Sequence, residues 1–253
     1  MKLMSVGLTD VGRKRNHNED SFLLDTDLQL FVVADGMGGH AGGGTASTLA
    51  VQTIDKEIRK LWELPDSPFG RKTTLEDSPL PQHLRAAVER SCVEIFKAAQ
   101  SNPRLSGMGT TVIALLIHQE HALFAHVGDS RAYLIRKELI QQISEDHSLV
   151  NEQVKAGMIT PEEAKHSNYR NIITRSVGFE EEVQVDVLGL LSEPDDIFIL
   201  CSDGLANAVE DEEMKRIALH TPAFEEIPQK LIALANERGG EDNITVVIVR
   251  RIS

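Results

Sequence analysis

The sequence predicts an α+β fold, a sandwich of two antiparallel β-sheets flanked by α-helices on both sides. Short apolar segments typical of strands follow one another without helices between them, notably across 109–136 and 183–201. The long amphipathic segments typical of helices lie outside these runs. Consecutive strands pair readily as antiparallel hairpins, whereas a parallel sheet needs a crossover helix between its strands. A doubly wound parallel sheet is therefore disfavoured.

The expected strands are short segments rich in apolar and β-branched residues. They lie at 3–8, 21–24, 29–34, 109–118, 121–127, 131–136, 183–190, 195–201 and 243–250. The longest apolar runs, such as VIALLI at 112–117, are far too short to span a bilayer.

The expected helices follow the i, i+3, i+4 spacing of one buried face. Two long ones cover 82–100 and 42–62, the second beginning after its glycines. A third covers 225–237 and stops at a Gly-Gly pair. A shorter helix begins at Thr160, where a capping threonine is followed by proline and two acidic residues.

The composition is that of an ordinary globular protein and narrows the classes of partner. Apolar residues make up 41% and charged residues 26% of 253, enough for one large domain, and we expect a single domain over 1–253. The proline-rich segment 63–81 is expected to be a surface connection within it. With 39 acidic against 26 basic residues the net charge is −13, so the chain offers no basic face to nucleic acid and would repel anionic lipid.

Cysteine content and the first residues predict a location. Cys92 and Cys201 sit in apolar patterns without partners at zinc spacing, which is typical of a reducing compartment. The segment MKLMSVGLTDVGRKR has no apolar core followed by a small-residue cleavage site. We therefore expect a cytoplasmic protein with no nucleic-acid and no membrane partner.

Several aspartates share one placement, at an end of an apolar strand and beside glycine or asparagine. They are Asp35 after FVVA, Asp129 after AHVG, Asp203 after FILCS and Asp242 before ITVVIV. Glu19 and Asp20 are two further acidic residues, directly before the apolar segment SFLL. Any one of them alone is explained by turn formation, because Asp and Gly are favoured turn residues. Together, carboxylates at the strand ends of one sheet converge, and they repel one another unless cations lie between them.

Carboxylate oxygens are suitable ligands for magnesium, manganese or calcium. Ligands spread over the whole chain argue against a calcium loop, whose ligands lie within about twelve residues. We expect a catalytic site assembled by the fold, with two metal ions that share Asp35. Such a pair lowers the pKa of a bridging water and stabilises in-line displacement at phosphorus. Arg15 is placed to grip phosphate through parallel hydrogen bonds, the alternative being a solvated basic turn.

Two other sites are disfavoured. The segment GMGGHA at 36–41 matches a dinucleotide-binding pattern, but Asp35 would direct negative charge at the pyrophosphate and the neighbouring elements are not βαβ units. His118, His121 and His126 suggest zinc, but strand alternation sends them to different faces.

A series of motifs resembles, in order, those of the metal-dependent type 2C protein serine/threonine phosphatases (PPM family), above all the compact bacterial enzymes. The motifs are RNHNEDS, VADGMGGHAGGGTAS, GMGTT, HVGDSRAYL, SEDHS, ITRSVG, LCSDGL and GGEDNITVVIV. The resemblance covers nearly the whole chain. It implies a β-sandwich with a binuclear manganese or magnesium centre at one end.

The resemblance implies roles for the ligand positions. Asp35 matches the aspartate that bridges the two metals, and Gly36 the residue whose carbonyl oxygen binds one of them. Asp203 and Asp242 match the remaining carboxylate ligands. Asp129 matches the aspartate that, with Asp203, holds a third, weaker metal.

Further positions match supporting residues. Arg15 matches the phosphate-gripping arginine, and Glu19 and Asp20 match acids that act mainly through metal-bound waters. Asn243 is expected to play the same supporting role, without binding a metal directly. The segment 148–172 resembles the mobile flap beside the site.

The chain departs from the family pattern at two positions. Gly44 stands where many members have glutamate, which loosens the start of the helix. Met37 stands where eukaryotic relatives carry a histidine proposed as general acid, as it does in bacterial members. The proton donor is left open between a metal-bound water and His40.

The implied activity is hydrolysis of phosphoserine and phosphothreonine by in-line attack of a metal-bridging water or hydroxide, without a phosphoenzyme. The expected partners are phosphorylated proteins and a cognate serine/threonine kinase, and the expected state is a monomer. The alternative is a catalytically weak phosphoprotein-binding regulatory module of the same fold, which metal affinity too weak for turnover would favour.

Overall fold

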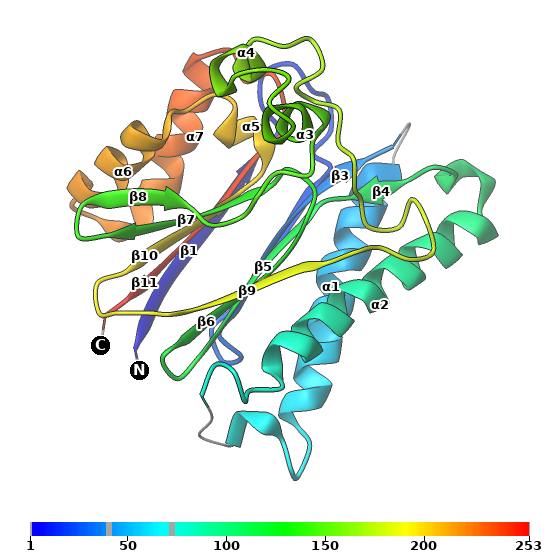
Figure 1. The fold of residues 1–253 in the computed structure, drawn as a ribbon, viewed down its shortest axis with the longest axis vertical. Helices are drawn as coiled ribbons and strands as arrows, with labels where there is room; N and C mark the ends of the chain where they lie inside the picture. The colour runs from blue at the N-terminus through cyan, green and yellow to red at the C-terminus, as the bar shows by residue number, and fades with distance from the viewer. Residues whose placement is uncertain (1, 39–41, 71–73, 253) are drawn as a thin grey trace.

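The computed structural model describes residues 2–38, 42–70 and 74–252. It shows two stacked β-sheets with helices over both outer faces, as the sequence predicts (Figure 1). Every pair of neighbouring strands runs antiparallel, so the βαβ units that a dinucleotide site requires do not occur among the described residues.

The sheets are built from strands distant in sequence. The first sheet has the order β1 (Leu3–Asp10), β11 (Ile244–Arg251), β10 (Ile197–Cys201), β7 (Arg131–Arg136) and β8 (Leu139–Gln142). The second has the order β2 (Asp20–Asp25), β3 (Leu30–Met37), β5 (Val112–His118), β6 (His121–Val127) and β9 (Asp186–Leu191), with the short β4 (Gly109–Thr110) beside the end of β3.

The helices divide between the two outer faces. Helices α1 (Gly42–Trp62) and α2 (Leu80–Ser101) cover the second sheet, and α6 (Asp211–His220) and α7 (Ile227–Glu237) cover the first (Figure 1). The short helices are α3 (Leu149–Lys155), α4 (Pro161–Lys165) and α5 (Asp203–Ala206), with single 3₁₀ turns at Pro68–Gly70, Pro103–Leu105 and Phe224–Glu226.

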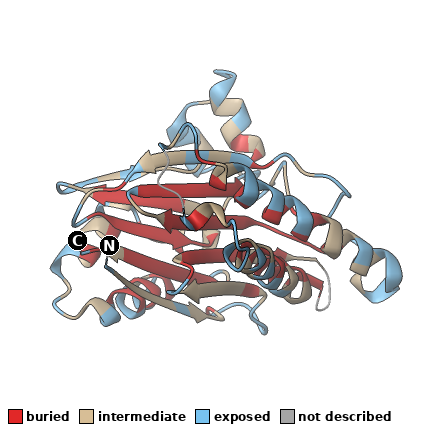
Figure 2. Cartoon of the chain, turned by 90° about the horizontal axis from the view of Figure 1, so that it is seen from below, coloured by how far each residue is buried: buried red, intermediate tan, exposed pale blue. Residues whose placement is uncertain are grey.

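Strand alternation produces three apolar layers, and the strands are the most buried part of the chain (Figure 2). In β3, Val32 and Ala34 pack under the helices α1 and α2, whereas Phe31 and Val33 face the other sheet. Each fully buried large side chain contributes about 1.5–3 kcal/mol relative to exposure. Register is therefore strongly specified, because a slip by one residue would exchange the two faces.

Several boundaries differ from the sequence-based expectation. Helix α1 begins at Gly42 and includes its glycines, and the expected strand 109–118 divides at Thr111 into β4 and β5. Strand β8 and helices α3, α5 and α6 were not predicted. In the part of 63–81 that is described, Phe69 is buried and its ring lies 4.9 Å from that of Trp62.

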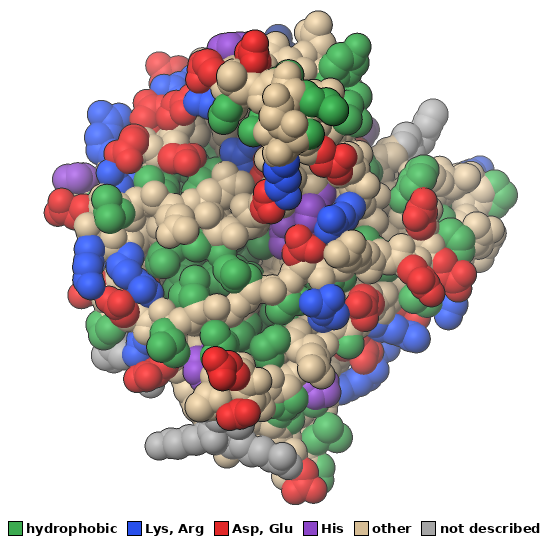
Figure 3. All heavy atoms as spheres, viewed as in Figure 1, with side chains coloured by type: hydrophobic (Ala, Val, Ile, Leu, Met, Phe, Trp, Pro, Cys, Tyr) green, Lys and Arg blue, Asp and Glu red, His purple; other side chains and the backbone are tan. Residues whose placement is uncertain are grey.

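The sandwich is open between its edge strands β8 and β9, where hydrophobic side chains line a hollow (Figure 3). A cavity of about 390 Å³ here is lined by Ile113, Phe124, Ile143 and His126, among others. His118 and His121 lie opposite each other, on the face of the sheet away from His126, so the three do not meet. None of the described helices has both the length and the apolar character needed to cross a membrane.

Candidate metal centre

Strands β2 and β3 bring two carboxylates together. Asp20 and Asp35 are directly paired across the antiparallel ladder. Asp35 lies inside β3 rather than beyond its end, because Gly36 and Met37 continue the strand and pair with β4. Like charges directly opposite one another are destabilising, so this pair needs compensation from elsewhere.

Asp20 is buried, and one of its carboxylate oxygens is held by hydroxyl groups. Its Oδ2 accepts hydrogen bonds from Ser202 Oγ at 2.9 Å and from Thr245 Oγ1 at 2.6 Å. Its Oδ1 is buried without a hydrogen-bond partner. These hydroxyls, from the end of β10 and the start of β11, were missed by sequence reasoning, because serine and threonine are common and nothing in their spacing marks them.

The backbone of Asp35 is fixed by two threonines. Its N–H donates to Thr111 Oγ1 at 2.9 Å, and its carbonyl oxygen accepts from Thr111 N and Thr110 Oγ1, both at 2.8 Å. Thr111 Oγ1 also contacts Ser130 Oγ at 2.7 Å. This buried network joins Asp35 to the turn that carries Asp129 and leaves the Asp35 carboxyl facing the other acids.

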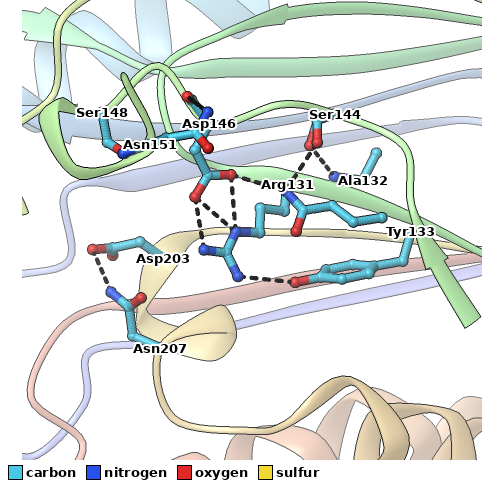
Figure 4. Close-up of polar contacts among 10 residues, drawn as sticks. Arg131, Ala132, Tyr133, Ser144, Asp146, Ser148, Asn151, Asp203 and Asn207 are labelled. Atoms are coloured by element: carbon cyan, nitrogen blue, oxygen red, sulfur yellow. Dashed lines mark hydrogen bonds and ion pairs between the residues drawn. The ribbon is translucent and has the colours of Figure 1, made fainter. Parts of the chain in front are cut away.

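Asp203 begins helix α5, and its Oδ2 accepts from Asn207 Nδ2 at 3.1 Å (Figure 4). Its Oδ1 is buried without a hydrogen-bond partner, and its charge helps to raise the pKa of Asp35. The following Gly204 is required sterically, because a Cβ there would lie 2.1 Å from the carbonyl oxygen of Asn243.

Asp242 and Asn243 tie the N-terminal loop to the last strand. Asp242 Oδ2 accepts from Arg15 Nη2 at 2.6 Å. Asn243 Oδ1 accepts from Glu19 N at 2.8 Å, and its Nδ2 donates to the carbonyl oxygens of Val11 and His17, both at 2.9 Å. One buried asparagine therefore holds both ends of the loop that carries Arg15.

Strand β3 and helix α1 touch through backbone at Gly36 and Gly43. A Cβ on Gly36 would lie 2.1 Å from Gly43 O and 2.5 Å from Glu19 O, so no side chain fits. Gly44 differs, because the nearest atom to a Cβ there is Glu19 Cα at 3.7 Å. Gly44 is thus not required by close contact.

The Asp129 turn is fixed by residues that the sequence did not single out. Arg131 donates to Asp146 through Nε at 2.9 Å and Nη2 at 2.7 Å, and its Nη1 donates to the Tyr133 hydroxyl at 3.2 Å (Figure 4). Gly128 N donates to His147 Nδ1 at 3.1 Å. The motifs HVGDSR and SEDHS, separate in sequence, therefore form one unit beside the acidic cluster.

Crowding of carboxylates shifts their ionisation. Desolvation, and next the charges of neighbouring acids, raise the pKa of Asp129 to about 7 and that of Asp203 to about 6. Desolvation also raises the pKa of Asp20 to about 7, although its two hydroxyl hydrogen bonds oppose the shift. The pKa of Asp35 is raised well above its usual value by desolvation and by Asp20, Asp203 and other acids.

The donor set fits divalent cations. Buried carboxylate oxygens of Asp20 and Asp203 lack partners, and the acids repel one another, so positive charge would relieve both deficits. Among the described residues, no three Asp, Glu, His or Cys side chains close around one point. The fit to cations therefore rests on the unpaired carboxylate oxygens, since Mg²⁺ can be held by one or two carboxylates together with several waters.

All the predicted site residues meet at one end of the sandwich. Arg15 contacts Asp242, Asn243 holds Glu19, and the pKa of Asp35 is raised by the charges of the other aspartates of the cluster. Fold and site together define a two-sheet α+β protein with a cluster of carboxylates whose oxygens suit divalent cations, and with Arg15 beside it.

Comparison with known proteins gives the family. The family model for protein phosphatase 2C matches residues 12–244. The serine/threonine phosphatase stp of Listeria monocytogenes is 38% identical over 246 residues, covering 96% of this chain and 94% of that protein. The chain therefore belongs to the protein phosphatase 2C family.

Solved structures agree with this result. The serine/threonine phosphatase PstP/Ppp of Mycobacterium tuberculosis superposes with a TM-score of 0.86 at 34% identity, covering 99% of each chain. A structure of the catalytic domain of PstP in complex with two manganese ions superposes with a TM-score of 0.85 at 34% identity, again covering 99% of each chain.

Proposed function

We propose that the aspartate cluster holds two divalent cations, Mn²⁺ or Mg²⁺, and that the protein uses them to hydrolyse phosphoserine and phosphothreonine in other proteins. Membership of the protein phosphatase 2C family makes the chain a metal-dependent serine/threonine protein phosphatase. The observation that carries the residue assignment is the set of crowded carboxylates with unpaired buried oxygens at Asp20 and Asp203.

The proposed ligands divide into those of the two main ions and those of a weaker third ion. Asp35 would be shared by both ions, with the Gly36 carbonyl, Asp203 and Asp242 completing the protein ligands. Asp129, with Asp203, would hold a weaker third ion. Bound cations supply a water of lowered pKa and stabilise negative charge on the phosphoryl group.

The chain's own side chains orient the substrate and the water around the ions. Arg15 keeps one Nη2–H on Asp242, and its half-exposed guanidinium has further N–H groups to donate to phosphoryl oxygens. Asp20, fixed by Ser202 and Thr245, and Glu19, fixed through its backbone by Asn243, present acceptors to water molecules.

The leaving serine or threonine oxygen needs a proton. The Met37 thioether has none to give, so the donor is a water or His40, which lies outside the described residues. Replacing His40 by alanine and comparing the pH profile of kcat distinguishes these two donors.

The test of the function is hydrolysis of p-nitrophenyl phosphate and of a phosphothreonine peptide during a manganese titration. Activity should rise with manganese on both substrates and vanish when a chelator is added. A folded chain that binds the phosphopeptide but hydrolyses neither substrate at any manganese concentration would contradict this proposal. It would instead indicate the catalytically weak binding module.

Replacing Asp129 by alanine should change the metal requirement more than the maximal rate. The carboxylate lies beside Asp203 but is not paired with Asp35 in the strand ladder, so its loss should leave the two-ion core intact. We expect the manganese concentration for half-maximal activity to rise about tenfold, the scale of effect of residues supporting a metal site. An unchanged titration would count against the third ion.

Other assignments remain part of this proposal. Residues 148–172 would act as the flap, since its base is closed by a backbone hydrogen bond from Leu149 N to Ile172 O at 2.8 Å while α4 stays exposed. We also propose a single catalytic domain over 1–253 with a connection at 63–81. It would act in the cytoplasm as a monomer opposite a cognate serine/threonine kinase, without nucleic-acid or membrane partners.

A further inference from the structure

A cavity of about 760 Å³ is lined by Arg15, whose guanidinium contacts Asp242 of the candidate metal centre. One wall is the loop 14–19, and the other is the start of α1 with Gly44, Thr45, Thr48 and Leu49. We call this cavity the Lys14 groove. Because Arg15 lines it, a molecule bound through a phosphoryl group at Arg15 can extend into it.

The groove is lined by two basic side chains and one acidic one, on a chain whose net charge is −13. Lys14, Arg15 and His17 line it, and Glu19 is the only acidic side chain in its walls as described. Within the described residues Lys14 forms no ion pair, whereas Arg15 is paired with Asp242. Lys14 is therefore a cation in these walls that can pair with an anionic group of a bound chain.

The loop that carries these charges is rigid. Arg13 N and Lys14 N both donate to the carbonyl oxygen of Gly240, at 2.8 and 3.1 Å. Asn243 holds the loop at Val11 and His17, and Asn18 Nδ2 donates to Thr9 Oγ1 at 2.8 Å. Charges on a fixed backbone select between partners, because little conformational entropy is lost when they bind.

We propose that the Lys14 groove binds the part of a phosphoprotein substrate next to its phosphorylated residue and selects acidic side chains there. The proposal rests on the proposed function, because it places the phosphoryl group at Arg15. An extended peptide advances about 3.3 Å per residue, so glutamate or aspartate within two or three positions of the phosphorylated residue reaches Lys14 and His17. The Leu49 side chain and the hydroxyl groups of α1 form the opposite wall.

The test compares peptides that differ only beside the phosphorylated residue. Peptides with a nonhydrolysable phosphonate analogue of phosphothreonine, flanked by glutamate or by alanine, are titrated by fluorescence anisotropy into the manganese-loaded protein. We expect the glutamate peptide to bind about five- to tenfold more tightly at low salt, and this ratio to approach one at about 0.5 M salt, where exposed charges are screened.

Charge reversal locates the effect. Lys14→Glu should remove or invert the preference for the glutamate peptide. Lys97→Glu, the same change at an exposed position on α2, should keep it. The ratio of the two affinities is the readout, so a general loss of binding does not mimic the result. Equal affinities in the wild-type protein, or an unchanged ratio in Lys14→Glu, would overturn the proposal.

A turnover assay with the alanine-flanked phosphothreonine peptide separates the two proposals. If the protein hydrolyses this peptide but binds the glutamate and alanine peptides equally well, the phosphatase function stands and the groove proposal is wrong. No turnover together with a preference for glutamate overturns the phosphatase and retains the groove as a phosphopeptide site.

Discussion

Asp203→Asn abolishes turnover of every phosphoester substrate, with an expected loss in kcat of at least about 10³-fold, more than the 10–100-fold typical of residues that only support a metal site. The substitution keeps the shape of the side chain and removes one negative charge from the centre of the cluster. It also replaces one of the two carboxylate oxygens, both of which could bind a cation, by an NH2 group, which cannot. The measurement is p-nitrophenyl phosphate hydrolysis at saturating manganese.

A matched variant separates chemistry from folding. Asp195→Asn makes the same change at an exposed carboxylate that pairs with Arg250, on a backbone with φ of 69°, where asparagine is well tolerated. It should keep full activity. Circular dichroism should show both variants folded. Near-normal rates in Asp203→Asn would show that the cluster is not the catalytic centre.

Without metal, the protein should become more stable as the pH falls from 8 to 6.5. In the unfolded chain these aspartates have a pKa near 3.8, whereas in the folded chain burial raises the pKa of Asp20 and Asp129 to about 7. The folded state therefore binds more protons in this window, and its stability falls as the pH rises. We expect a net gain of about 1 kcal/mol at pH 6.5, because protonation of His126 in the unfolded chain offsets part of the effect, or a melting temperature about 3 °C higher.

The choice of pH range and the control measurements show whether the change in stability comes from the aspartate cluster. Below pH 6.5 the trend is opposed by His126, since desolvation lowers its pKa in the folded chain to about 3 and the unfolded chain then binds the extra proton. Saturating manganese should shrink or invert the difference, because cations compete with protons for the same oxygens. Asp129→Asn should weaken it. Equal melting temperatures at pH 6.5 and 8 in chelator would contradict the mutual repulsion of the carboxylates.

Strong periodicity made the main elements of the fold predictable. Residues 42–62 carry a continuous apolar stripe, and their helix has the expected end at Trp62. Helix α6 was missed because only Met214 and Ala218 of its ten residues are buried, too few to mark a face. Strand β8 has four residues with a half-polar sequence, and its place is set by pairing with β7. Tertiary contacts decide such elements.

The site was predictable where residue type and position coincided. Asp35, Asp203 and Asp242 stand out because a carboxylate beside glycine or asparagine ends or begins an apolar run. The groups that hold them do not stand out. Ser202, Thr245 and Thr111 act through hydroxyls, and their hydrogen bonds to Asp20 or Asp35 join residues 182, 225 and 76 positions apart in the chain.

The pairing of β1 with β11 joins the beginning of the fold to its last strand, which matters for the order of folding during synthesis. A nascent chain emerges N-terminus first, so β1 has no β11 to pair with until Ile244–Arg251 has been made. Asp242 and Asn243, which fix Arg15 and Glu19, emerge at the same moment. The edge of the first sheet and the contacts that hold Arg15 and Glu19 are therefore completed together, by the last strand of the fold.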